Sequence, residues 1–150
     1  MPYQIFQWTG DPLQIPERYW ASAQAVPPNG GPLIDTVRFT PFTSCIGILA
    51  SSGEGEDTQI VGIHLSLMDT NDNWFDNGAV AQVMAVLQNY PDNRWIVGQT
   101  TIWEDTPTVS AAYQNLVNQI GEADYLSGDD GIYSGALNQV DELEGRYIAA

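Results

Sequence analysis

Two runs of apolar and β-branched residues, joined by a short polar loop, constrain the fold of this chain more than any other feature. The first run, SCIGILAS, covers residues 44–51, and the second, TQIVGIHLSLM, covers residues 58–68. Runs of this length and composition are typical of β-strands. The loop GEGED between them is typical of a turn because of its glycines. The sequence therefore predicts a pair of antiparallel strands.

The hydrophobic period changes after this strand pair. In the segment DNGAVAQVMAVLQNY, Val80, Val83, Met84 and Leu87 recur at the spacing of one helical face. Asp76 is the expected N-cap of this helix, because an aspartate side chain accepts from the free amides of the first turn.

The remaining elements follow from the same patterns. The helix TPTVSAAYQNLVNQIG has Thr106 as its expected N-cap and Gly121 as its expected end. The other expected elements are a short strand near residues 3–8, a helical turn at 17–25, strands at 34–39 and 94–103, and a third helix at 136–148. This order predicts an α+β fold, in which a mixed or mostly antiparallel sheet is covered by two to three helices.

The length and the distribution of proline indicate a single domain over residues 1–150. A chain of 150 residues can bury an ordinary core without further staples. Residues 1–32 hold six of the nine prolines, including the break PPNGGP, and we expect them to form an extended lead-in. We expect residues 33–150 to form the α+β core.

The chain is strongly acidic, with a net charge of −15 from 19 acidic residues and four arginines, and it contains no lysine. A protein that binds a phosphate backbone needs a basic face, so binding to nucleic acid or to an anionic membrane is not expected. The acidic field can steer a basic protein partner, or it can serve solubility alone.

The N-terminal sequence MPYQIFQWTG has neither the basic start nor the apolar core of a classical signal peptide. We expect the protein to be cytoplasmic in the producing cell, or to be secreted without such a signal. The absence of lysine suits a translocated bacterial effector, since ubiquitin is attached to lysines in a eukaryotic cytosol. Drift in a small acidic protein explains the same absence equally well.

Cys45 and His64 are the only cysteine and the only histidine in the sequence. An internal disulfide is therefore impossible, and so is a zinc site made from cysteine and histidine alone. The acidic segment DTNDNWFDNG lacks the glycine and the closing glutamate of a calcium-binding loop. We expect no metal and no cofactor.

The Cys45–His64 pair is the candidate for catalytic chemistry. A cysteine nucleophile reacts as the thiolate, and a neighbouring imidazole commonly removes its proton. Cys45 lies at the entry of the first predicted strand and His64 lies inside the second, so antiparallel pairing can bring them together. A register change of one residue would place them on opposite faces of the sheet. The alternative interpretation is that both are ordinary core residues.

Neighbouring residues can supply the other groups that such chemistry needs. The backbone amides of Ser44 and Ile46, on either side of Cys45, are the candidate oxyanion donors. Thr40 is the candidate for orienting the imidazole.

The segments TPFTSCIGIL and IVGIHLSL, followed by the helix GAVAQVMAVLQNY and the strand WIVGQTT, resemble the cysteine glutamine-deamidase superfamily over residues 36–102. This superfamily includes the chemoreceptor glutamine deamidase of bacterial chemotaxis and toxins of the cytotoxic-necrotizing-factor type. The corresponding positions are Thr40, Ser44, Cys45, His64 and Gly98. Thr43 stands where the family has a glycine.

The resemblance implies deamidation of a glutamine in a protein substrate. Cys45 would form a thioester with the side-chain carbonyl, and His64 would act first as base and then as acid. Thr40, or otherwise Gln59 or Gln99, would hold the tautomer of the imidazole. Transglutamination and hydrolysis of a small amide are open alternatives.

The second candidate function is a non-enzymatic one. An acidic inhibitor or immunity-type protein would bind a basic protein surface, with tryptophans as anchors. The tryptophans are Trp8, Trp20, Trp74, Trp95 and Trp103. We expect Trp95 and Trp103 to be core residues of one strand.

Overall fold

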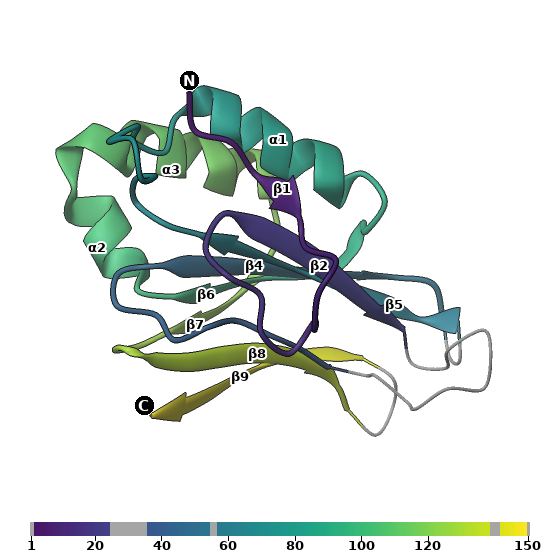
Figure 1. Ribbon diagram of the computed structural model, residues 1–150. Helices are drawn as coiled ribbons and strands as arrows, with labels where there is room; N and C mark the ends of the chain where they lie inside the picture. Colours follow the sequence, from purple (N-terminus) through teal and green to yellow (C-terminus); the bar gives the residue numbers. More distant parts are fainter. Residues whose placement is uncertain (1, 25–35, 55–56, 139–141, 150) are drawn as a thin grey trace.

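The computed structural model describes residues 2–24, 36–54, 57–138 and 142–149. Within these residues the chain forms three layers (Figure 1). Helices α1 (Asn77–Leu87), α2 (Thr100–Asp105) and α3 (Pro107–Ile120) cover one face of a six-stranded sheet. A three-stranded sheet packs against the other face. The predicted α+β fold in a single domain is therefore confirmed.

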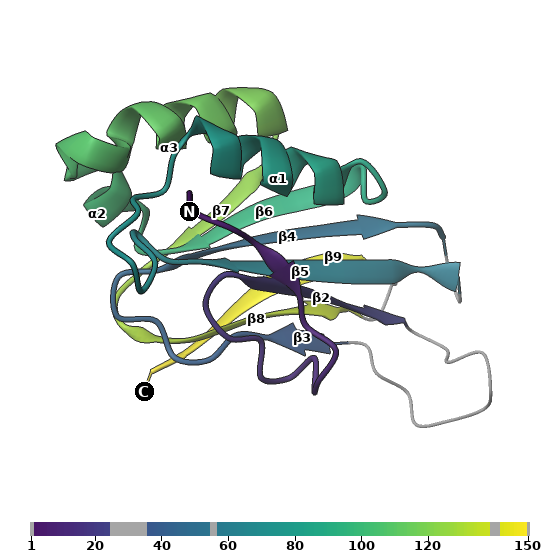
Figure 2. The same cartoon turned by 45° about the horizontal axis from the view of Figure 1, so that its top comes forward.

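The large sheet has the strand order β1-β2-β5-β4-β6-β7, and the small sheet has the order β3-β8-β9. Figure 2 shows β3 beside β8 on the side of the molecule away from the helices. The strands are β1 (Phe6–Gln7), β2 (Tyr19–Gln24), β3 (Thr36–Arg38), β4 (Ile46–Ser52), β5 (Gln59–Leu65), β6 (Asp92–Gly98), β7 (Asp124–Ser127), β8 (Gly131–Leu137) and β9 (Leu143–Ala149).

The predicted antiparallel pair is β4 and β5, at the centre of the large sheet. Alternate residues of each strand face opposite layers. Ile46 and Ile63 belong to the cluster beneath the helices, whereas Leu49 and Ile60 belong to the cluster between the two sheets. Both strands are therefore buried on both faces, which explains their nearly continuous apolar sequences.

The small sheet approaches the large sheet closely at two glycines. A Cβ atom on Gly47 would lie 2.5 Å from Cε2 of Phe39, and one on Gly62 would lie 3.1 Å from the same ring. The Phe39 ring therefore packs directly on the backbones of β4 and β5. This contact fixes the spacing of the two sheets beside the candidate residues.

The predicted helix ends are largely confirmed. Asp76 is the N-cap of α1, and its side chain accepts from the amide of Ala79 at 2.8 Å. Gly121 ends α3 with φ of 76°, a conformation that favours glycine. Thr106 is the N-cap residue of α3, but its hydroxyl donates to the carbonyl of Ile102 at 2.6 Å and makes no capping bond.

Three predicted elements are wrong. In the described part of the helix expected at residues 136–148, residues 136–137 end β8 and residues 143–148 belong to β9, because Leu137 and Leu143 pack in the cluster between the two sheets. The expected helical turn at residues 17–25 is replaced over Tyr19–Gln24 by β2, which pairs with β5. The strand expected at residues 94–103 ends at Gly98, and α2 follows it.

Two predictions about the N-terminal part lie wholly or partly outside the described residues. The break PPNGGP lies wholly outside them, and so do the first two residues of the strand expected at 34–39, of which Thr36–Arg38 forms β3. The expected short strand near residues 3–8 is β1, which pairs with β2 in parallel. Part of the expected extended lead-in thus supplies two strands of the large sheet.

We expect Gly47→Ala to lower the free energy of unfolding by about 1–3 kcal/mol, because the added methyl group displaces the Phe39 ring. Urea denaturation of the variant and the parent protein measures this difference. Ser52→Ala, at the end of the same strand, is the matched control and should change stability by less than about 0.5 kcal/mol. Equal stability of Gly47→Ala and the parent would contradict the close approach of Phe39.

Candidate functional site

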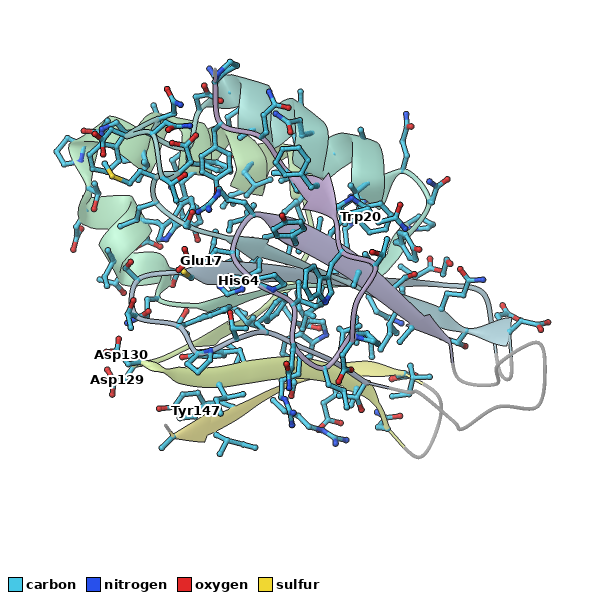
Figure 3. All side chains as sticks on the ribbon, viewed as in Figure 1. Glu17, Trp20, His64, Asp129, Asp130 and Tyr147 are labelled. Atoms are coloured by element: carbon cyan, nitrogen blue, oxygen red, sulfur yellow. The ribbon has the colours of Figure 1, made fainter. Side chains whose placement is uncertain are left out.

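The β4–β5 register places Cys45 and His64 on the same face of the large sheet. His64 lies directly opposite Gly47, and Cys45 precedes Gly47 by two residues, so both side chains face the small sheet. The Cys45 sulfur, a ring nitrogen of His64 and a carboxylate oxygen of Glu17 all lie within 4.8 Å of one another. Figure 3 shows Glu17 and His64 next to each other above the small sheet.

The imidazole of His64 is held by a backbone carbonyl from the loop before β2. Nδ1 donates to the carbonyl oxygen of Ile15 at 2.8 Å, which requires the proton of the neutral ring to be on Nδ1. Nε2 is buried and has no hydrogen-bond partner. A buried polar atom without a partner costs about 1–3 kcal/mol, so this free acceptor is the unexplained group of the site.

The second neighbour of Nδ1 is Thr40. Its hydroxyl lies 3.4 Å from Nδ1 and 3.4 Å from the Ile15 carbonyl oxygen, and its backbone amide donates to that same oxygen at 3.0 Å. Both hydroxyl distances are long for a hydrogen bond. The Ile15 carbonyl therefore orients the ring, and Thr40 helps to position that carbonyl.

The walls of the histidine pocket are aromatic. The rings of Phe39 and Phe42 have centroids 5.4 Å and 4.7 Å from that of His64. His64 itself has no exposed surface. The imidazole thus lies in a largely apolar environment, with the Ile15 carbonyl, Thr40 and the Cys45 and Glu17 groups among its polar neighbours.

Glu17 lies over the sulfur of Cys45. The thiol donates to its carboxylate Oε1 at 3.4 Å. The Glu17 side chain is 45% exposed, whereas Cys45 is only 1% exposed. Glu17 therefore lies between the sulfur of Cys45 and the solvent.

Burial keeps both members of the pair uncharged. Loss of hydration and, to a smaller extent, the negative charge of Glu17 together raise the pKa of the Cys45 thiol to about 12. Loss of hydration also lowers the pKa of His64 to about 4. Near neutral pH the arrangement therefore contains a thiol beside a neutral imidazole whose Nε2 lone pair has no hydrogen-bond partner.

Neighbouring backbone groups also affect the thiol. Hydrogen bonds from the amides of Ser44 and Thr43 lower the pKa of Cys45, although less than burial and Glu17 raise it. Ser44 was an expected oxyanion donor, and Thr43 was not. Ile46 begins β4, between Leu65 and Gly98, and its side chain lies in the cluster beneath the helices.

The two glutamines named as alternatives to Thr40 lie elsewhere. Gln59 is exposed at the start of β5, five residues before His64 on the same strand. The side-chain amide of Gln99 donates to a carboxylate oxygen of Asp130. The structure therefore brings Thr40, and neither glutamine, to the imidazole.

Glu17, Cys45 and His64 also offer one donor atom each for a metal ion. Zinc accepts this combination of oxygen, sulfur and nitrogen ligands, but it requires a deprotonated sulfur. In the described arrangement the thiol donates a hydrogen bond to Glu17, so binding of a metal ion here would require the sulfur to lose its proton.

The tryptophans expected as interface anchors differ widely in exposure. Trp103 is completely buried, as expected, but it lies in α2 instead of a strand. Trp74 is 37% exposed, and the other three tryptophans are half-buried. Trp20, labelled in Figure 3, packs against the cluster beneath the helices.

Comparisons with known proteins add no family assignment: a scan against protein-family models gave no match, and a search of curated proteins gave none either. Among the described helices, none is long and apolar enough to cross a bilayer.

Sequence patterns alone missed two groups of the site, the Ile15 carbonyl and the Glu17 side chain. Both come from a loop 28 or more residues before Cys45, and neither belongs to a motif. The pairing of β2 with β5 carries this loop to the site, since Tyr19 lies opposite His64. A strand prediction at β2 would have been the only available signal.

We expect alkylation of Cys45 by iodoacetamide to be slow near neutral pH and to accelerate about tenfold per pH unit, because only the thiolate reacts. A pKa of about 12 predicts a rise without a plateau up to about pH 10. Intact-protein mass spectrometry against time measures the rate. In urea the same thiol should reach a plateau near its ordinary pKa, and a plateau below about pH 8 in the folded protein would contradict the buried, protonated state.

Proposed function

We propose that this protein is a cysteine hydrolase that deamidates glutamine side chains in a protein substrate. One observation carries the proposal: Cys45 and His64 share a face, and the Ile15 carbonyl leaves Nε2 as a free base. A nucleophilic thiol requires such an acceptor for its proton.

The proposed mechanism starts from the protonated thiol and the neutral imidazole. Nε2 of His64 takes the proton of the Cys45 thiol, and the sulfur attacks the carboxamide carbon. The backbone amides of Ser44 and Thr43, which act on the thiol, would donate to the oxyanion. The imidazolium protonates the departing ammonia, and a water molecule activated by the same imidazole hydrolyses the thioester. The products are ammonia and a glutamate side chain.

The resemblance in element order supports glutamine as the substrate over other amides. The antiparallel strand pair, the helix α1 and the glycine-ended strand β6 occur here in the sequence order expected for that superfamily. In the described arrangement the thiol is covered, so a substrate has to displace the Glu17 side chain before attack.

We expect the protein to release ammonia from unfolded casein, with a mass gain of about one dalton per converted glutamine. Cys45→Ala and His64→Asn should abolish the release, because one removes the nucleophile and the other removes the base. A coupled ammonia assay and peptide mass spectrometry measure the reaction. Ser52→Ala should retain the release of ammonia. The parent protein should also retain it after treatment with EDTA, since no proposed step uses a metal.

The proposal would be contradicted if neither the parent protein nor Glu17→Ala, which uncovers the sulfur, released more ammonia than Cys45→Ala. Binding to a basic protein that survives Cys45→Ala and weakens with salt would then favour the non-enzymatic alternative. The net charge of −15 is the property that supports this alternative.

We expect Thr40→Val to lower kcat by no more than about tenfold, because Nδ1 keeps its short bond to the Ile15 carbonyl. Thr40→Ser should restore the parent rate. Steady-state kinetics on the same substrate provides the measurement. A loss as large as that of His64→Asn would show that Thr40 itself holds the ring.

A further inference from the structure

The Glu17 side chain brings its terminal group to the sulfur of Cys45. Its Oε1 atom accepts a hydrogen bond from the thiol at 3.4 Å. The same carboxyl group lies within 4.8 Å of a ring nitrogen of His64. No other described carboxylate forms a hydrogen bond with either residue.

Glutamate and glutamine side chains have the same length and shape. They differ only in whether the second terminal atom is oxygen or an amide nitrogen. A glutamate is also the product of glutamine deamidation. The chain therefore presents to its own thiol a side chain with the shape of the proposed substrate and the chemistry of the proposed product.

The backbone around Glu17 is fixed to the strand that carries His64. The amide of Arg18 donates to the carbonyl of His64 at 2.7 Å, and the Ile15 carbonyl accepts from the imidazole. Arg18 has φ of 65°, a conformation that a non-glycine residue adopts only when its surroundings hold it there. These contacts fix the backbone of residue 17 at a position from which its side chain reaches the sulfur.

The buried Nε2 of His64 is an independent sign that a reacting group belongs at this place. It has no partner while Glu17 covers the sulfur. A carboxamide and its departing ammonia would provide that partner during the reaction. The covered state thus leaves unsatisfied the same atom that catalysis would use.

We propose that Glu17 occupies in cis the subsite for the side-chain amide of the substrate, and that it shields Cys45 until a substrate glutamine replaces it. This inference rests on the proposed function. It adds that the subsite selects side chains by length. It accepts a glutamine side chain projecting from a surface loop, and it rejects asparagine, which is one methylene shorter.

The inference predicts self-deamidation when residue 17 carries an amide. In Glu17→Gln the sulfur forms a bond to the introduced carboxamide carbon while its proton moves to Nε2 of His64. The C–N bond then breaks, and the imidazolium gives its proton to the departing ammonia. Water cleaves the thioester, which restores the thiol and leaves glutamate at position 17.

The experiment is peptide mass spectrometry of purified Glu17→Gln. We expect a gain of about one dalton at residue 17, and none when Cys45→Ala or His64→Asn is combined with it. Gln14, in the same loop, is an internal control that should stay unchanged. Glu17→Asn should not be converted beyond its own Cys45→Ala background, because the shorter side chain does not reach the sulfur.

A second measurement separates the two proposals. Alkylation of Cys45 by iodoacetamide should be at least about tenfold faster in Glu17→Ala than in the parent protein, the effect of one pKa unit on the thiolate fraction. One outcome is that the amide introduced at position 17 persists, the alkylation rate of Glu17→Ala equals that of the parent, and casein is still deamidated. The inference about Glu17 is then wrong and the proposed function stands. If that amide persists and casein is not deamidated by any form, both are wrong. Conversion of the introduced amide that needs Cys45 supports both.

Discussion

The register between β4 and β5 is the constraint on which the candidate site depends. It sets Gly47 opposite His64 and thereby turns Cys45 toward the same layer. Gly47 and Gly62 carry no side chains, so the Phe39 ring can lie against the backbone at this point. A shift of one residue would turn His64 toward the helices and would separate it from both Cys45 and Phe39.

Backbone atoms complete the site from a distant part of the chain. The Ile15 carbonyl and the Arg18 amide fix residues 15–18 to β5. The same carbonyl also accepts a hydrogen bond from the Thr40 amide. These bonds do not depend on the identity of the side chains that flank them. The orientation of the imidazole is therefore a property of the chain path, supported by the pairing of β2 with β5.

Protection and reactivity place opposite demands on this site. Burial among apolar side chains keeps the thiol protonated and the imidazole neutral, because each charged form would lose hydration, and the negative charge of Glu17 further favours the protonated thiol. In the state that we propose for catalysis, displacement of Glu17 takes a negative charge away from the sulfur, which favours the thiolate. The same side chain would thus both cover the thiol and control its reactivity.

Local patterns in the sequence determined much of the fold. The period-3.6 stripe and the Asp76 cap predicted α1, and the apolar runs predicted β4 and β5, since each signal lies within the element it specifies. The same reasoning failed at residues 136–148 and 17–25. There the short segments carry weak helical patterns, and pairing with strands distant in sequence overrode them.

The sequence by itself also determined the chemical inventory: one thiol, one imidazole, no lysine and a large excess of carboxylates. It identified Cys45, His64 and Thr40 as a group, but it could not decide whether the first two shared a face. Only the tertiary structure decided this, and only the structure brought Ile15 and Glu17 to the pair. The reason is physical: strand register and loop placement depend on contacts between segments tens of residues apart, and no local pattern in the chain encodes them.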